Sequence, residues 1–420
     1  MKERLIAGLD LGSSSIRLAV GQLSIGQDKR AVLNLIGAVE IASFGIAKGS
    51  VKSLEDAVSS ISSCLETAER QIGLPISEAY IGLGGVMMQV VPAKGVIGVS
   101  RPDGEIREED CHRVLESARS VVNPANYEIL HTIATRFAID GQSGIKDPVG
   151  MQGIRLEADV FIIEGLSSHV RNLTKSVIRT NLEVSGLVYA PLATAEAVLS
   201  SRQKELGVVM IDIGSSTTSI VVYEEGDLLH SAVIPIGSDH ITNDIAIGLR
   251  TSLDIAEVCK RNYVSATPDA VGVDDTIDLQ AIGGEESEIV SSRFMSEIAQ
   301  ARAEEIFEKV EVELARIDRS GMLPAGAVLT GGGAKLHGLT EVAKEVMRLP
   351  AAVSGAKQIT TPLAEVAQDP AFSTAIGIML WGYESERGEE SGMGYGVGIG
   401  EGFVKKIGSP IKRLFKSFIP

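Results

Sequence analysis

Aromatic side chains are scarce in this sequence, where they make up 4% of 420 residues and include a single tryptophan, Trp381. Proteins that stack single-stranded nucleic acid need several exposed rings, so this class of function is not expected. Basic residues are outnumbered as well, 39 against 55 acidic ones, and the formal net charge is −16. Because nucleic acid carries a dense negative charge, this balance argues against general nucleic-acid binding.

Cysteines and long apolar runs are also few. Cys64, Cys111 and Cys259 lie far apart and share no metal-ligand spacing, which predicts buried free thiols in a reducing compartment. No stretch approaches the roughly 20 apolar residues of a transmembrane helix. The apolar run near the start is too short for a signal peptide and is broken by Asp10. We therefore expect a cytoplasmic protein whose contact with a membrane is peripheral.

Two common nucleotide-binding signatures are missing: the P-loop Gly-x-x-x-x-Gly-Lys-Ser/Thr and a Gly-x-Gly-x-x-Gly after a strand. The sequence carries instead two matching turns, at 8–15 and 210–218. Each turn reads as an apolar strand, an aspartate, one apolar residue, a glycine, a run of small hydroxyl residues and a second apolar strand. A third glycine-rich turn follows at 329–334.

These turns have the chemistry of a phosphate site. Gly12 and Gly214 lack a Cβ, so backbone N–H groups can approach phosphate oxygens closely. Asp10 and Asp212 repel phosphate, but they can hold Mg²⁺ through its waters. One such turn is most often an ordinary hairpin, whereas two copies and a triple glycine favour an ATP and Mg²⁺ site. The hydroxyl donors are Ser13, Ser14, Ser15, Ser215, Ser216, Thr217 and Thr218.

The length predicts about two to four domains, and the hydrophobic patterning changes along the chain. Residues 1–83 have an α/β pattern, with strands expected at 5–9, 16–22, 33–42 and 78–83 and a helix at about 53–72. Residues 84–165 resemble a compact α+β insert, with a hairpin expected at 86–91 and 95–99, a helix at 108–120, and strands at 132–139 and 159–164.

The α/β pattern returns after the insert. The expected helices lie at 167–185, 193–199, 287–318, 340–347 and 371–382. The expected strands lie at 186–190, 208–213, 220–223 and 327–329. Residues 386–402 contain seven glycines in seventeen positions, a composition typical of a flexible linker.

The last segment, 403–420, has the pattern of an interfacial helix. At helical spacing its apolar residues fall on one side and its five basic residues on the other, with no acidic residue between them. Such a helix binds an anionic leaflet, although a terminal helix can also dock on its own protein. The residues expected to meet the membrane are Phe403, Ile407, Ile411, Lys412, Arg413, Leu414, Phe415, Lys416 and Phe418.

Taken together, these motifs resemble the actin and heat-shock chaperone superfamily of ATP-binding proteins, and within it the bacterial FtsA cell-division family. The resemblance covers nearly the whole length and is carried by 8–17, 207–218, 234–246, 256–261 and 329–333. Segments 193–199 and 371–377 look like the two helices that connect the lobes of that fold. The resemblance implies an actin-like two-lobed α/β fold with an inserted α+β subdomain and a C-terminal amphipathic helix.

The resemblance also implies a division of the chain into subdomains. The expected parts are the first lobe core (1–83 and 166–200, with part of 371–385), the inserted subdomain (84–165), the second lobe core (201–236 and 319–370), its small subdomain (237–318), the linker (386–402) and the membrane helix (403–420).

Residue roles follow from the matched positions. Arg17 falls where actin keeps a phosphate-binding lysine, and Glu257 and Lys260 would reach the ribose and flank the adenine. The adenosine would pass close to the backbone of Gly331, Gly332 and Gly333. Glu196 falls where actin has its water-orienting glutamine and would be the catalytic residue, or it is an exposed helix residue without that role. Serines at 215, 216 and 238 replace expected glycines, which puts hydrolysis in doubt more than binding.

The partners implied by the resemblance are the C-terminal peptide of FtsZ, further copies of the chain in a head-to-tail filament, and anionic lipids. Arg293 and Arg302 are candidate contacts for the acidic groups of the FtsZ peptide. The expected place is the cytoplasmic face of the membrane at the division site. Two alternatives stay open at this stage: an adaptor of the same superfamily for another machine, such as pilus assembly, and a sugar kinase of the same fold.

Overall fold

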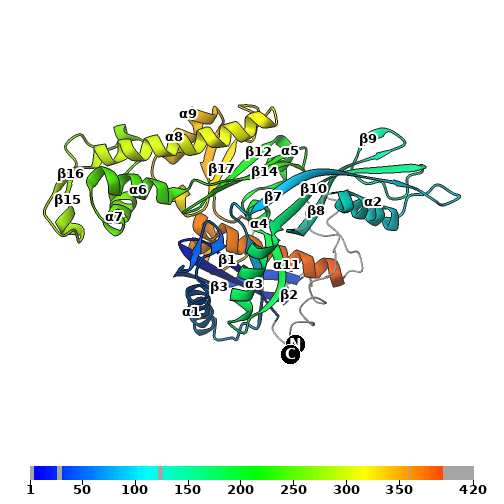
Figure 1. Ribbon diagram of the computed structural model, residues 1–420, viewed down its shortest axis with the longest axis horizontal. Helices are drawn as coiled ribbons and strands as arrows, with labels where there is room; N and C mark the ends of the chain where they lie inside the picture. Colours follow the sequence, from blue (N-terminus) through cyan, green and yellow to red (C-terminus); the bar gives the residue numbers. More distant parts are fainter. Residues whose placement is uncertain (1–3, 26–30, 122–125, 358, 391–420) are drawn as a thin grey trace. The chain divides into compact units, whose positions relative to one another are not determined.

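The computed structural model describes residues 4–25, 31–121, 126–357 and 359–390 (Figure 1). The membrane helix expected at 403–420, with all its named residues, lies outside this range. The last helix, α11 (Ser373–Glu390), includes the first five residues of the linker expected at 386–402. Glu and Arg are good helix formers, and Arg387 pairs with Glu384 at 3.2 Å, one turn earlier, which favours this extension.

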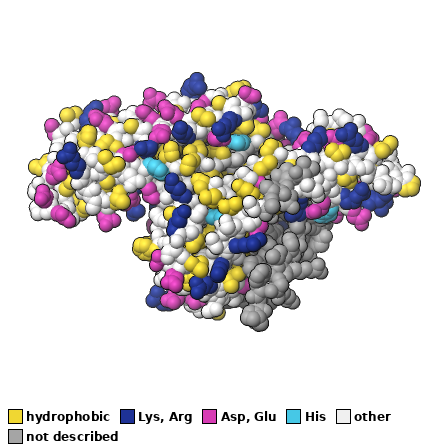
Figure 2. Space-filling view, in the orientation of Figure 1, with side chains coloured by type: hydrophobic (Ala, Val, Ile, Leu, Met, Phe, Trp, Pro, Cys, Tyr) yellow, Lys and Arg dark blue, Asp and Glu magenta, His cyan; other side chains and the backbone are white. Residues whose placement is uncertain are grey.

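The described surface carries charges of both signs. On the face drawn in Figure 2, acidic and basic side chains are interspersed with hydrophobic ones. No helix among the described residues is both long enough and apolar enough to cross a bilayer.

The chain separates into two compact units. The first comprises Met1–Val91, Asn123–His131 and Ile162–Leu380, and the second comprises Pro92–Val122, Thr132–Phe161 and Trp381–Pro420. The first unit contains two five-stranded sheets of the same design, and the second contains most of the insert.

The first sheet has the order β11-β6-β1-β2-β3. Antiparallel strands β1 (Leu5–Leu11), β2 (Ser15–Ile25) and β3 (Ala31–Ala42) are followed by β6 (Glu78–Leu83) and β11 (Glu183–Tyr189), which run parallel to β1. Helices α1 (Leu54–Ile72) and α3 (Ser167–Ile178) pack beside it. Helix α1 is capped at its start by Ser53, whose side chain accepts from the Asp56 N–H at 3.4 Å, and at its end by left-handed Gly73.

The second sheet repeats this design in the order β14-β13-β12-β17-β18. Its strands are β12 (Val208–Ile213), β13 (Thr218–Glu224), β14 (Asp227–Ile234), β17 (Ala327–Thr330) and β18 (Ala351–Val353). Strands β12 to β14 are antiparallel, and β17 and β18 run parallel to β12. Because β12 occupies the place of β1, Asp10 and Asp212 occupy equivalent positions near the ends of the two central strands.

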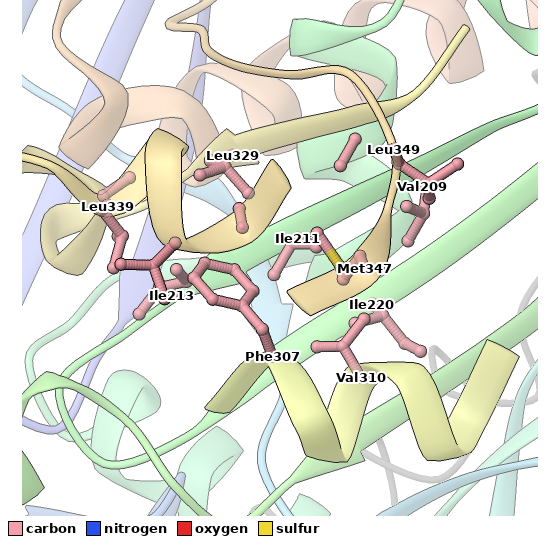
Figure 3. Packing of buried hydrophobic residues seen from close by; sticks show 14 of the residues in the cluster. Val209, Ile211, Ile213, Ile220, Phe307, Val310, Leu329, Leu339, Met347 and Leu349 are labelled. Carbon is pink, nitrogen blue, oxygen red and sulfur yellow. The ribbon is translucent and has the colours of Figure 1, made fainter. Parts of the chain in front are cut away.

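Helices α8 (Ser292–Arg316) and α9 (Leu339–Met347) cover the second sheet (Figure 1). Figure 3 shows Phe307 and Val310 of α8 directed at the side chains of the central strands, and both are fully buried. Burial of such residues contributes about 1.5–3 kcal/mol each, so this core fixes the strand that ends at Asp212. The small subdomain has a separate core between α6 (Ser238–Leu249), α7 (Leu253–Tyr263) and the start of α8.

The insert contains a four-stranded sheet in the order β7-β10-β8-β9 and helix α2 (Glu108–Val121). Its strands are β7 (Met88–Gly98), β8 (Tyr127–Ile139), β9 (Gln142–Ile145) and β10 (Arg155–Leu166). The hairpin expected from strands at 86–91 and 95–99 is wrong, because one strand, β7, runs from Met88 to Gly98 without a turn. A Cβ on Gly95 would overlap the Val114 carbonyl of α2, so this glycine allows the strand and the helix to pack closely.

Two helices connect the sheets of the first unit. Helix α4 (Ala190–Val198) follows β11 of the first sheet and, through the short α5 (Ser201–Leu206), leads to β12 of the second. Helix α11 returns from the second sheet and packs on β1, where a Cβ at Gly8 would overlap the Ala375 carbonyl. The helix expected at 167–185 was too long, since it ends at Ile178 and Asn181 adopts a left-handed φ of 63°.

Candidate functional site

A cleft of about 740 Å³ lies in the first unit and is lined by turns of both sheets. The β1–β2 turn contributes Asp10, Gly12, Ser13, Ser14, Ser15 and Arg17. The β12–β13 turn contributes Asp212, Gly214, Ser215, Ser216 and Thr217, and the loop after β17 contributes Gly331, Gly332 and Gly333. Glu257 and Lys260 of α7 complete the set that the sequence predicts for a nucleotide. The structure thus brings together groups that are far apart in the chain.

The two hairpin turns are tight because of their glycines. A Cβ on Gly12 would come within 2.5 Å of the Ser15 carbonyl oxygen, and the Gly214 N–H donates to Thr217 O at 2.9 Å. The hydroxyl run therefore turns back within a few residues, with its backbone and side chains at the cleft wall. This geometry suits the binding of an anion by N–H and O–H donors.

The two aspartates at the cleft floor have perturbed pKa values. Burial raises the pKa of Asp10 to about 7 and that of Asp212 to about 6. The Arg17 guanidinium opposes this effect at both carboxyls, whereas the Asp212 charge adds to it at Asp10. Two buried carboxyls, one of which raises the proton affinity of the other, form a site that gains from a cation, and oxygen ligands of this kind fit Mg²⁺. Among the described residues, no group of three His, Cys, Asp or Glu side chains is placed to hold a metal ion.

Glu40 of β3 is a cleft residue that the sequence did not single out. It faces Arg17 in the strand register, accepts from its Nη2 at 2.9 Å and accepts from Ser15 Oγ at 2.7 Å. Burial alone would raise the pKa of Glu40, but the Arg17 charge and these hydrogen bonds hold it below its usual value. Only the cross-strand pairing of β2 and β3 could have revealed it.

Glu257 and Lys260 form a connected group on α7 with Thr242 of α6. The Lys260 Nζ lies 2.5 Å from Glu257 Oε2 and 2.8 Å from Thr242 Oγ1, and Thr242 donates to Glu257 at 2.6 Å. Burial would raise the pKa of Glu257, but the Lys260 charge beside it lowers that pKa overall. The group sets a carboxylate and an ammonium at fixed places on the cleft wall, as recognition of hydroxyl groups requires.

Glu196 does not line the cleft. Its Oε1 lies 2.7 Å from the Nζ of Lys204, a largely buried lysine whose ammonium also lies 5.0 Å from the Tyr223 ring centre. The structure gives Glu196 a structural partner and does not bring it to the phosphate turns.

Arg293 and Arg302, the predicted partner contacts, lie on α8 outside the cleft. Arg293 Nη2 is 2.8 Å from Asp269, and Arg302 holds both oxygens of Asp244 at 2.7 and 3.1 Å. Both guanidinium groups are therefore engaged by acidic side chains of the small subdomain.

The duplicated sheet, the two connecting helices and the cleft between matched turns define an actin-like protein. The fold is similar to a solved PilM–PilN type IV pilus biogenesis complex, with a TM-score of 0.64 and 16% identity over 90% of this chain and 98% of that one. It is also similar to MreB5 of Spiroplasma citri bound to AMPPNP, with a TM-score of 0.53 and 13% identity over 93% and 99%.

Sequence comparison is more specific. The family model "Cell division protein FtsA" matches residues 209–377, and "SHS2 domain inserted in FTSA" matches 85–164. The FtsA protein of Pseudomonas aeruginosa is 35% identical over 91% of this chain and 90% of its own length, and that of Escherichia coli is 32% identical over 98% and 96%. The chain belongs to the FtsA family of actin-like cell-division proteins.

Proposed function

We propose that this cell-division protein binds Mg²⁺-ATP in its cleft and uses it as a switch for self-assembly. The observation that carries the proposal is the placement of two Asp-x-Gly turns and a triple glycine around one cleft. The same fold is named as bound to ADP and to AMPPNP in MreB5 of Spiroplasma citri.

Each wall of the cleft has a role in this proposal. The two hairpin turns bind the phosphates, and Asp10 and Asp212 hold the waters of Mg²⁺, which neutralises charge on the phosphates. Arg17, fixed by Glu40, supplies a positive charge near the same turns. Glu257 and Lys260 bind the ribose and flank the adenine, while the glycines at 331–333 let the adenosine approach the backbone.

Hydrolysis is proposed to be slow or absent. The water-orienting role of Glu196 stays a prediction, and its ion pair with Lys204 would have to open before the carboxylate could act as a base. The nucleotide would then act mainly on conformation and on head-to-tail assembly.

The proposed role in the cell is to tether FtsZ to the inner face of the membrane. The amphipathic segment 403–420 would bind anionic lipid, 386–402 would contribute reach, and the small subdomain at 237–318 would receive the FtsZ peptide. Arg293 and Arg302 can serve this peptide only by exchanging the carboxylates of Asp269 and Asp244 for those of the partner.

Calorimetric titration with ATP and Mg²⁺ tests the nucleotide site, with Asp212→Asn as the cleft variant and Asp159→Asn, an exposed residue of the insert, as its control. We expect the wild type and Asp159→Asn to bind equally and Asp212→Asn to lose Mg²⁺-dependent affinity. Wild-type protein that binds no ATP would refute the proposed site.

The adaptor role needs a second experiment, co-sedimentation with anionic vesicles and FtsZ. Wild-type protein should carry FtsZ to the vesicles, while Arg302→Glu should reach the vesicles without FtsZ. A pilus adaptor remains the alternative, because the pilus complex shares this fold at 16% identity. The proposed role would be contradicted if the wild type did not bind the vesicles. It would also be contradicted if Arg302→Glu carried as much FtsZ to the vesicles as the wild type.

A further inference from the structure

The two connecting helices touch each other directly beside Asp212. Helix α11 approaches α4 so closely that a Cβ on Gly377 would overlap the Ala193 carbonyl. One turn away, the hydroxyls of Thr194 on α4 and Thr374 on α11 meet with their oxygens 2.9 Å apart. Both threonines are buried, with exposed fractions of 0% and 7%, and of the two only Thr374 lines the cleft.

These hydroxyls form a series of hydrogen-bond contacts that begins at the cleft. Thr374 Oγ1 lies 3.2 Å from Asp212 Oδ2, and Thr194 Oγ1 donates to the Ala190 carbonyl at 2.9 Å. Ala190 is the first residue of α4. A carboxylate of the proposed metal site is thus joined through two side chains to the first turn of a helix that connects the two sheets.

This series of hydroxyls has fewer hydroxyl hydrogens than hydrogen-bond contacts. A threonine hydroxyl donates one hydrogen, so two hydrogens serve three contacts: Asp212 with Thr374, Thr374 with Thr194, and Thr194 with the Ala190 carbonyl. If Thr374 donates to Asp212, then Thr194 must choose between Thr374 and Ala190. If Thr374 instead donates to Thr194, the hydrogen of Thr194 is free for Ala190.

We propose that Thr374 is a positioning residue for Asp212 and that Thr194 relays the state of this carboxylate to α4. The inference rests on the proposed Mg²⁺-ATP site and extends it to the hinge between the halves of the first unit. A cationic ligand that interacts with the Asp212 carboxylate weakens the hydrogen bond that this carboxylate accepts from Thr374. Both hydroxyls then turn toward α4, and the first turn of this helix gains a hydrogen bond.

The first test measures ATP affinity of Thr374→Val with Mg²⁺ and in excess EDTA. Valine keeps the shape but removes a donor that Asp212 engages in the ligand-free state and gives up on binding, so affinity with Mg²⁺ should rise about tenfold. In EDTA the variant should bind like the wild type, because a general loosening of the cleft would weaken both. Thr374→Ser, which keeps the hydroxyl, should restore the wild-type affinity and guards against a folding defect.

Thr174→Val is the matched control. Thr174 is a buried threonine of α3 that donates to a carbonyl one turn earlier, Val170 O at 2.8 Å, as Thr194 does, but it does not line the cleft. It should lose stability like the other variants and keep ATP affinity.

The second test follows hydrogen exchange in α4 with and without Mg²⁺-ATP. The wild type and Thr174→Val should show slower exchange at the start of α4 when nucleotide binds. Thr194→Val should lose this response and, because the coupling is reciprocal, a matching part of its affinity. The double variant with Thr374→Val should match Thr374→Val alone in affinity. Equal affinity of Thr374→Val and the wild type, or an unchanged exchange response in Thr194→Val, would overturn this inference but leave the proposed function standing. A wild type that binds no ATP would overturn both.

Discussion

At the scale of single residues, the cleft stores unfavourable electrostatics that a ligand can relieve. Asp10 is held near Asp212 and away from water, with Arg17 as the nearby opposing charge, and its pKa rises from 3.8 to about 7. A carboxyl whose pKa is higher in the folded state favours folding most when it is protonated. The nucleotide-free fold should therefore lose stability as pH rises from about 4 through about 7, and the loss should be complete above that range.

Asp10→Asn should remove this loss. We expect the variant to be more stable than the wild type at pH 8 without nucleotide, by on the order of 2 kcal/mol, and equally stable at pH 4. Mg²⁺-ATP should then stabilise the wild type but not the variant. Thermal melts across this pH range measure both effects. A variant less stable than the wild type at pH 8 would contradict the argument.

His131 predicts the opposite pH dependence. It accepts a hydrogen bond from the Tyr189 N–H at 3.0 Å, and burial lowers its pKa from 6.5 to about 4. The neutral ring is favoured in the folded state, so its contribution is present above pH 6.5 and is lost as pH falls toward 4. His131→Gln should reduce this acid sensitivity by on the order of 1–2 kcal/mol, measured as the difference in urea unfolding free energy between pH 7 and pH 4.5. Equal pH dependence in the variant and the wild type would contradict the assignment.

At the scale of elements, β7 shows where packing decides between a turn and a strand. Gly95 and Gly98 lie on this strand, but only Gly95 faces the backbone of α2, while a Cβ on Gly98 would meet open space. Gly95→Ala should therefore cost about 1–3 kcal/mol through overpacking, and Gly98→Ala should be close to neutral. Urea unfolding of the two variants measures the difference. Equal stability would indicate that α2 can move aside.

The same strand shows what sequence reasoning could and could not reach. The duplicated turns predicted both central hairpins, because an aspartate and a glycine after an apolar strand are local signals. The hairpin expected from strands at 86–91 and 95–99 was wrong, and the close contact of Gly95 with α2, a helix distant in the local pattern, could not be read from the sequence. Glu40 and Thr374 were missed for the same cause: each matters through a partner on another element, Arg17 and Asp212. Glu196 was matched by position, and its buried partner Lys204 was not foreseen.

At the scale of the whole molecule, the sequence separates charge between the body and the last segment. Residues 403–420 contain five basic residues and no acidic one, so the remainder has a formal charge of −16 − 5 = −21. An anionic membrane repels such a body and attracts the segment by about 1 kcal/mol per basic residue. The proposed tether therefore has to overcome the repulsion of its own protein, which makes binding sensitive to salt and to lipid charge.

This charge balance gives the final prediction. Replacing Lys405, Lys406, Lys412, Arg413 and Lys416 by glutamine should abolish binding to anionic vesicles, although the apolar face is intact. In the wild type, raising the salt from about 0.1 M to about 1 M shortens the screening length from about 10 Å to about 3 Å, so it should weaken attraction and repulsion together. Binding that remains at high salt then measures the apolar face alone, and Phe415→Ser should remove it. Vesicle co-sedimentation at both salt concentrations, with neutral vesicles as the control, separates the two contributions. If the glutamine variant bound anionic vesicles as tightly as the wild type, the positive charges would have no part in the tether, and the apolar residues would have to supply it alone.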